Sequence, residues 1–182
     1  MSASRELDGQ EFECFTFEAL DDGAILRVTI DRPGSLLNAV DATLHHELAT
    51  LFSMLRPRID LRAIVLTGSP GAFSAGGDFS WFPELRTPER LAELRVAARS
   101  MIWDLLDIEV PIVAAIGGPA VGLGASIALL CDVIVMADDA VIGDPHVKVG
   151  LVAGDGGVVI WPLVLGPARA KELLLTGDSV PA

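Results

Sequence analysis

Two glycine-rich stretches of the chain could together bring backbone N–H groups to one ligand atom. They read Phe73-Ser-Ala-Gly-Gly-Asp78 and Gly118-Pro-Ala-Val-Gly-Leu-Gly124, and each follows a short apolar run typical of a buried strand. Glycine lets the backbone approach a ligand closely, and a helix that begins in such a turn directs its unpaired N–H groups and the positive end of its dipole at the same point. This geometry suits a carbonyl oxygen that gains negative charge during a reaction. Either turn alone is more readily explained as a tight connection.

The second turn lies inside residues 111–131, a stretch without a charged residue. Its length is that of a membrane-spanning helix, but its glycines and Pro119 would expose backbone polar groups that hydrocarbon cannot satisfy. A buried strand at Ile112–Ile116, a turn, and a buried helix at about Gly124–Leu130 explain the same residues better. We therefore expect no membrane partner.

The elements around the two turns alternate between strands and helices, which favours an α/β fold with a mainly parallel, layered sheet and flanking helices in one domain over residues 1–182. A hairpin is expected at 12–19 and 24–30, where Asp21-Asp22-Gly23 supplies the turn. Further strands are expected at 63–67, 112–116 and 133–137, and helices at 41–56, 88–106, 124–130 and 167–175. In the helix at 88–106, the residues predicted to face inward are Leu91, Leu94, Ala98, Met101, Ile102 and Leu105.

Composition limits the classes of partner. The chain has 182 residues, of which 51% are hydrophobic, and a formal net charge of −12. The mean hydropathy is +0.51, so we expect much of the sheet to be buried on both faces, with some apolar surface left for self-association. The acidic balance argues against nucleic acid as a partner, because phosphate binding requires clustered Lys and Arg.

The cysteines, the histidines and the N-terminal residues indicate no disulfide, metal site or targeting segment. Cys14 and Cys131 lie far apart and form no CxxC pair. His45 and His46 point to different sides of a helix, which does not favour a metal site. Residues 1–13 lack the basic and apolar regions of a signal peptide, so a cytoplasmic protein is expected.

Several short motifs follow one another in a characteristic order. They are Asp31-Arg32-Pro33 with Asn38-Ala39, the two glycine-rich turns, Cys131-Asp132 and Leu175-Thr-Gly-Asp178. In this combination the chain resembles the crotonase (enoyl-CoA hydratase/isomerase) superfamily from about residue 14 to 182. The resemblance implies a crotonase-like spiral of ββα units, an acyl-CoA thioester as partner with coenzyme A as part of the substrate and no separate cofactor, and a homotrimer or dimer of trimers. The family's C-terminal helices, which complete the CoA pocket and the trimer contact, are not recognisable here.

The resemblance also implies which residues hold the substrate. The N–H groups of Gly77 and Leu123 would bind the thioester carbonyl between them. The residues expected to bind the rest of the substrate are Arg32, Ala75, Asp78, Phe79, Trp81, Gly122 and Ser126. Arg32 is expected near a phosphate, and the aromatic residues either line an acyl pocket or pack in the core. Stabilising a thioester enolate makes the α-proton acidic and the β-carbon electrophilic, so one pair of N–H groups serves several reactions.

The acid/base residues depart from those of the family's hydratases, which use two glutamates. The matching positions here are Ser126 and His146, so the carboxylate pair that activates water is missing. His146 is the candidate base, because an imidazole titrates near neutral pH, and its alternative role is that of a loop histidine. Asp155 either faces the acyl group, orienting His146 or acting directly, or caps the following helix. The expected catalytic residues are therefore Gly77, Leu123, His146 and Asp155, without a metal.

Other functions fit the residues less well or remain open. Residues 122–127 lack the third glycine of a dinucleotide-binding turn. Ser74 and Ser126 each lie several residues beyond the nearest strand end, which a nucleophile elbow does not allow. The expected function is an acyl-CoA enzyme of the enoyl-CoA hydratase/isomerase type. The open alternatives are a crotonase-like acyl-CoA hydrolase and a non-catalytic protein that binds acyl-CoA or assembles with partners.

Overall fold

The largest sheet of the protein has four mutually parallel strands and one antiparallel strand at its edge. The computed structural model describes residues 3–69 and 71–182. The strand order is β3-β4-β5-β6-β8, with β3 at Phe15–Leu20, β4 at Ile25–Ile30, β5 at Ala63–Gly68, β6 at Ile112–Ile116 and β8 at Val133–Met136. β3 pairs antiparallel with β4 around the 3₁₀ turn η1 (Asp21–Gly23), and the other pairs are parallel. The predicted hairpin and the mainly parallel sheet are confirmed.

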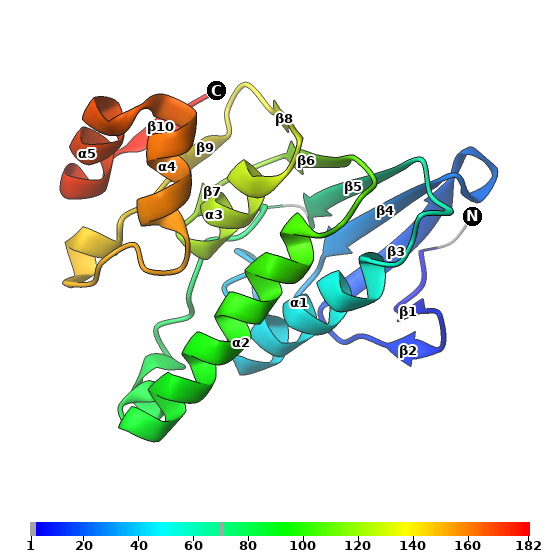
Figure 1. Ribbon diagram of the computed structural model, residues 1–182, viewed down its shortest axis with the longest axis horizontal. Coiled ribbons are helices and arrows are strands. Elements are labelled where there is room, and N and C mark those ends of the chain that lie inside the picture. Colours follow the sequence, from blue (N-terminus) through cyan, green and yellow to red (C-terminus); the bar gives the residue numbers. More distant parts are fainter. Residues whose placement is uncertain (1–2, 70) are drawn as a thin grey trace.

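The other elements surround this sheet. Three short strands form a second sheet in the order β10-β9-β7, at Ser179–Pro181, Val141–Gly143 and Ala120–Val121, and β1 (Glu6–Leu7) pairs with β2 (Gln10–Glu11). The helices are α1 (Ala42–Leu55), α2 (Pro88–Leu106), α3 (Leu123–Leu130), α4 (Gly157–Leu165) and α5 (Pro167–Thr176), with 3₁₀ turns η2 (Phe82–Leu85) and η3 (His146–Val149). α4 and α5 lie with the second sheet, at the end of the molecule away from β3 (Figure 1).

α1 and α2 pack together and cover one face of the large sheet (Figure 1). α1 begins where the Asp41 side chain accepts a hydrogen bond from the Leu44 N–H at 2.9 Å, as an N-cap residue does. It buries the apolar stripe Leu44, Leu48, Leu51, Phe52 and Leu55. The predicted helix and its inward face are therefore confirmed.

The predicted inward face of α2 is wrong for the first half of the helix. Met101 and Leu105 are buried and Ile102 packs against the core, whereas Leu94 and Ala98 are only half-buried and Leu91 is 47% exposed. Figure 1 shows that the first half of α2 extends beyond the sheet. Periodicity identifies a helix because it is a local property, whereas burial depends on what lies opposite.

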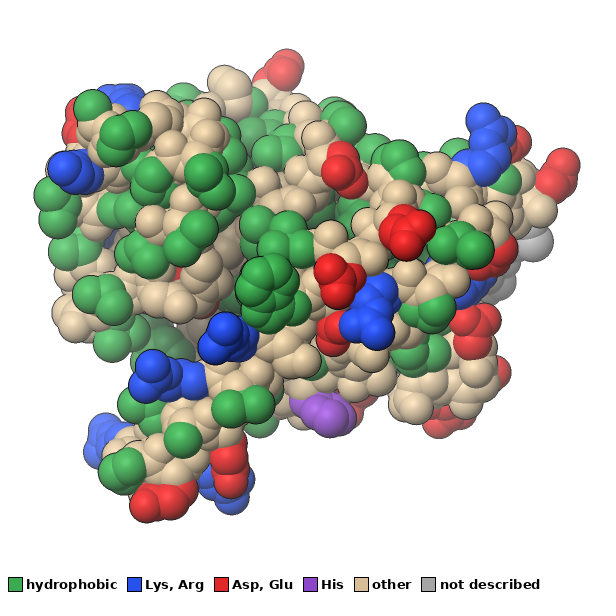
Figure 2. Space-filling view, in the orientation of Figure 1, with side chains coloured by type: hydrophobic (Ala, Val, Ile, Leu, Met, Phe, Trp, Pro, Cys, Tyr) green, Lys and Arg blue, Asp and Glu red, His purple; other side chains and the backbone are tan. Residues whose placement is uncertain are grey.

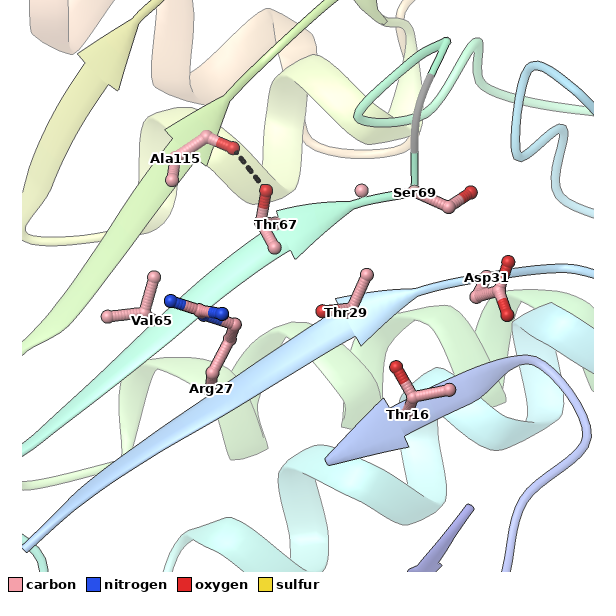
Figure 3. A pocket seen from close by; sticks show the side chains of 9 residues that line it. Thr16, Arg27, Thr29, Asp31, Val65, Thr67, Ser69 and Ala115 are labelled. Carbon is pink, nitrogen blue, oxygen red and sulfur yellow. Dashed lines mark hydrogen bonds between the residues drawn. The ribbon is translucent and has the colours of Figure 1, made fainter. Parts of the chain in front are cut away.

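The expectation that the large sheet is buried on both faces is also wrong. Its side chains alternate between the faces, and the face away from α1 and α2 carries Thr16, Arg27, Thr29, Val65 and Thr67, all of them partly or fully exposed. Figure 3 shows these side chains along an open hollow of about 540 Å³. Polar residues on one face are what a sheet with a single covered face requires.

Residues 111–131 form the predicted strand β6 and helix α3 rather than one long helix, and the turn between them contains the short strand β7, which was not predicted. Ala114 on β6 and Ala125 and Ala128 on α3 have no exposed surface, so the uncharged stretch belongs to the core. Among the residues described, no helix is both long enough and apolar enough to cross a membrane.

Apolar side chains are nevertheless exposed on several elements, as the high hydropathy predicts. Val133 and Val135 are exposed on the edge strand β8, and Val159 and Leu163 on α4. Figure 2 shows hydrophobic side chains gathered over α4 and α5. Apolar patches rimmed by polar residues commonly mark contacts between proteins.

Candidate active site

The two glycine-rich turns lie side by side in the structure. Ser74 and Ala120 form an isolated parallel bridge, in which the Val121 N–H donates to the Ser74 carbonyl at 2.8 Å. Gly76 has a φ of +78°, and a Cβ at this position would lie 2.7 Å from the Val121 carbonyl oxygen. Both the backbone conformation and the space therefore require glycine. Pro70, which belongs to the loop before the first turn, lies outside the described residues.

Asn38 holds the start of the first turn in place. Its side-chain amide is buried and donates to the carbonyls of Ile30 at 3.1 Å and Ala72 at 3.0 Å. The backbone carbonyl of Asn38 accepts a hydrogen bond from the Ser74 hydroxyl at 2.8 Å. The Ser74 side chain is thus a buried structural donor, which agrees with the sequence argument against a serine nucleophile.

Two backbone N–H groups of the turns have no acceptor within the part of the chain that the structure describes. The Val40 N–H donates to the Gly76 carbonyl and the Asp78 N–H donates to the Val40 carbonyl. In such a parallel bridge the residue between the two bonds, Gly77, directs its own N–H to the opposite side. Leu123 is the first residue of α3, where an N–H has no acceptor within the helix. Within residues 3–69 and 71–182, no acceptor is found for either N–H.

A cavity of about 220 Å³ lies against both turns and against the segment that follows β9. The predicted site residues that line it are Ala75, Gly77, Phe79, Gly122 and His146. The aromatic rings of Phe79 and Phe82 form part of its wall and meet edge to face, with centroids 5.4 Å apart. The cavity is therefore largely apolar, with an imidazole beside the glycine turns.

Other predicted residues lie outside the lining of this cavity. Ser126 is buried, and its hydroxyl donates to Asp155 at 3.4 Å. Trp81 packs against His45, with ring centroids 5.6 Å apart. α4 begins after Gly156, so Asp155 precedes the N-cap residue instead of being it.

Arg32 and Asp78 are engaged with each other. The Arg32 guanidinium lies 2.7 Å from the Asp78 carboxylate and 2.9 Å from that of Asp41, and it donates to the Ala39 carbonyl at 2.7 Å. Hydrogen bonds from Ser80 and then from Arg32 lower the pKa of Asp78 to about 2. This ion pair attaches the segment that follows Gly77 to residues 39–41, which Arg32 also contacts. A contact of either residue with coenzyme A remains a prediction.

His146 lies between two carboxylates. Asp144 Oδ1 is 2.5 Å from Nδ1 of the ring, and Asp155 Oδ2 is 3.5 Å from Nε2. A Cβ at Gly122 would lie 3.3 Å from Cε1 of the same ring, so the imidazole touches the second turn. Sequence reasoning did not identify Asp144. The available signal was its position two residues before His146, where an aspartate side chain reaches the backbone N–H, here at 3.4 Å.

The neighbouring carboxylates and burial change the pKa of His146, and burial also changes that of Asp155. The hydrogen bond with Asp144 raises the pKa of His146 above its ordinary value, against the opposing effect of burial, and the charge of Asp155 adds to the rise. Burial raises the pKa of Asp155, although the neighbouring imidazole opposes this. The site therefore holds a proton more readily than its separate groups would.

Asp144, His146 and Asp155 offer donor atoms within 4.8 Å of one another, which raises the question of a metal ion. The two carboxylates lie at opposite nitrogens of the ring, so they do not converge with one nitrogen on a common point. The arrangement is that of an imidazole hydrogen-bonded to one carboxylate, with a second carboxylate near its other nitrogen. Cys14 and Cys131 are free and buried, and burial raises the pKa of each to about 12, so neither is a thiolate nucleophile at neutral pH.

Comparison with proteins of known sequence identifies relatives over most of the chain. A probable mitochondrial enoyl-CoA hydratase of Dictyostelium discoideum is 35% identical over 161 residues, which are 88% of this chain and 56% of the relative. A carnitinyl-CoA dehydratase of Citrobacter koseri is 36% identical over 161 residues, which are 88% of this chain and 60% of the relative. The chain thus spans less than two thirds of the length of these curated relatives.

Comparison with solved structures and with protein families identifies the same kind of protein. An enoyl-CoA hydratase/isomerase from Mycobacterium paratuberculosis superimposes with a TM-score of 0.86 and 42% identity, over 93% of this chain and 68% of that one. A putative enoyl-CoA hydratase from Streptomyces coelicolor A3(2) gives a TM-score of 0.86 at 29% identity, over 98% of this chain and 66% of that one. The family described as enoyl-CoA hydratase/isomerase matches residues 21–182. The chain therefore belongs to the enoyl-CoA hydratase/isomerase family and has the crotonase fold.

Proposed function

We propose that this protein is an acyl-CoA enzyme that transfers protons at the acyl group of a thioester held against the two glycine-rich turns. The N–H groups of Gly77 and Leu123 polarise the thioester carbonyl, and His146 is the proton-transfer group, assisted by Asp155. The observation that carries this proposal is the cavity in which the imidazole of His146 lies beside both turns, with a carboxylate at each ring nitrogen.

The chemistry follows from stabilising negative charge on oxygen. Two N–H donors at the thioester oxygen lower the energy of the enolate, which makes the α-proton acidic and the β-carbon open to attack by water. An imidazole that titrates near neutral pH can take or return that proton. The Phe79 and Phe82 rings provide an apolar wall for the acyl chain. Coenzyme A enters as part of the substrate, and the proposed reaction needs no further cofactor.

The names of the relatives support hydration or dehydration within this class. One relative is named an enoyl-CoA hydratase and another a carnitinyl-CoA dehydratase. In this chain the imidazole of His146 takes the place of a carboxylate pair. The same base could serve in water addition, in a double-bond shift or in thioester hydrolysis.

A panel of enoyl-, hydroxyacyl- and oxoacyl-CoA esters, analysed by mass spectrometry, tests the proposal. We expect turnover by the wild-type protein, and a loss of roughly 10²- to 10⁴-fold in His146→Ala. Asp155→Asn should lose less, because it keeps the imidazole. Release of free coenzyme A would identify a hydrolase, and ester binding without turnover by any variant would identify a binding protein and refute the enzymatic assignment.

A further inference from the structure

Asp144 is the more enclosed of the two carboxylates next to His146. It follows β9 directly, and its side chain is 1% exposed. Its Oδ1 meets Nδ1 of His146 at 2.5 Å and also accepts the backbone N–H of the same residue at 3.4 Å. An aspartate enclosed to this degree costs free energy unless it has a partner, and the imidazole is the partner found here.

The other oxygen of Asp144 rests on the start of α4. Oδ2 is buried and has no hydrogen-bond donor within the described residues. A Cβ at Gly157 would lie 2.2 Å from it, so only glycine leaves room for this oxygen. Gly157 does not have a positive φ, and its lack of a side chain is therefore explained by space rather than by backbone conformation. The N-terminus of α4 also favours a negative charge at this point.

These contacts determine which ring nitrogen carries the proton of the neutral imidazole. The carboxylate of Asp144 lies closer to the ring than that of Asp155, at 2.5 Å from Nδ1 against 3.5 Å from Nε2, so the proton of a neutral His146 lies on Nδ1 and the lone pair lies on Nε2. Nε2 is the nitrogen beside Asp155, 3.5 Å from its Oδ2. Asp144 has little exposure and cannot reach a substrate itself.

We propose that Asp144 is a positioning residue that keeps a proton on Nδ1 of His146, so that every proton exchanged with the substrate passes through Nε2. The inference rests on the proposed function for its catalytic consequence, but not for the state of the ring. When the α-C–H bond breaks, its electron pair moves into the thioester enolate and its proton binds Nε2. The ring then carries both protons and a positive charge next to the buried Asp144 carboxylate. Return of the Nε2 proton to carbon restores the neutral ring.

Few other charged groups lie close to the imidazole of His146 among the described residues. Asp155 approaches it from the loop before α4, and Ser126 on α3 donates to Asp155. Lys148 on η3 lines the cavity, and its Nζ lies 3.6 Å from the carboxylate of Asp178 beyond α5. The two glycine turns add no titratable side chain to the lining described here.

The first test is ¹⁵N NMR of the histidine side chains, which distinguishes the two ring tautomers without requiring turnover. His146→Gln identifies the signal of this residue among the three histidines. In the wild-type protein we expect the neutral ring to carry its proton on Nδ1. A neutral ring protonated on Nε2 would overturn the proposal, whatever the catalytic outcome.

The second test compares Asp144→Asn and Gly157→Ala with Asp139→Asn. The first removes the charge at nearly constant size, and the second displaces the carboxylate without changing any titratable group. The third removes an exposed aspartate in the turn before β9 and serves as the control for net charge. Circular dichroism establishes that each variant is folded.

In Asp144→Asn and Gly157→Ala we expect the midpoint of the His146 titration to move to lower pH. The acidic limb of kcat/KM should follow it downward, because the base becomes available at lower pH, and kcat should fall by roughly 10- to 100-fold. Asp139→Asn should change neither quantity. An unchanged His146 titration in both test variants would refute the role of Asp144. A wild-type protein with normal His146 titration but no turnover of any CoA ester would refute the proposed function instead.

Discussion

At the scale of single residues, the proposed chemistry depends on two N–H donors from distant parts of the chain and on two carboxylates at one histidine. His146 alone is an ordinary loop histidine, and its possible role as a base comes from the residues at its two nitrogens. Gly77 contributes only a backbone N–H. Substitutions at these positions therefore separate the roles of backbone and side chain.

Gly77→Pro should abolish turnover, because proline removes the N–H that is proposed to bind the thioester oxygen. Gly77→Ala keeps this N–H and brings a Cβ within 2.8 Å of the Phe82 ring, a side chain that can move. We expect a fall in kcat of roughly 10²-fold or more for proline and a smaller change, mainly in KM, for alanine. Steady-state kinetics on the best CoA ester measures both. Equal kinetics for the proline variant and the wild type would contradict the oxyanion assignment.

Asp78 should make stability depend on pH in the acidic range. Its folded pKa of about 2 is below the unfolded value of about 3.9, so its contribution is present above the unfolded pKa and is lost as the pH falls through about 2. Because the ion pair with Arg32 is partly exposed, we expect about 1–2 kcal/mol. Urea unfolding of the wild type and Asp78→Asn should show this difference at neutral pH, and the two should converge as the pH approaches 2. A difference that does not vary with pH would show that Asp78 acts by packing alone.

At the scale of elements, the helices and the strands of the large sheet were predictable but the strands of the second sheet were not, and the buried face was predictable for α1 but not for all of α2. α2 shows this most clearly, because its second half is buried while its first half extends beyond the sheet (Figure 1). β8 is an edge strand, so Val133 and Val135 are exposed although the sequence of β8 is as apolar as that of a core strand. The sequence pattern of an element predicts whether it is a helix or a strand, whereas the elements packed against it determine which of its side chains are buried.

The two halves of α2 should respond differently to the same kind of truncation. Met101→Ala removes a fully buried side chain and should lower the free energy of unfolding by about 2–5 kcal/mol. Leu91→Ala removes an exposed one and should change it by less than about 0.5 kcal/mol. Chemical unfolding of both variants provides the comparison. A loss of similar size at Leu91 would mean that the first half of α2 is covered in solution, for instance by another copy.

At the scale of the whole molecule, the exposed apolar side chains on α4 and α5 favour assembly (Figure 2). We propose a homotrimer or a dimer of trimers. Exposed apolar surface of this kind costs free energy in water and is usually covered by a partner.

Charge on α4 should weaken this assembly. Leu163 is 76% exposed on α4, and we expect Leu163→Lys to lower the sedimenting mass from that of a trimer or hexamer toward that of a monomer. Val96→Lys on the free half of α2 adds the same charge at a similarly exposed position and is the matched control. Analytical ultracentrifugation at several concentrations measures the distribution. A wild-type protein that sediments as a monomer throughout would contradict the proposed assembly.

The sequence by itself determined the order of the helices and of the strands in the large sheet, the two glycine turns, and membership of a family with acyl-CoA chemistry as the expected function. These depend on local causes, namely side-chain periodicity, turn conformation and motif order. Only the tertiary structure decided that one sheet face is open, that half of α2 is uncovered, and that Asp144 joins His146 to the start of α4. A carboxylate and a glycine 13 positions apart meet only because β9 and α4 are packed together, and no local pattern encodes that contact.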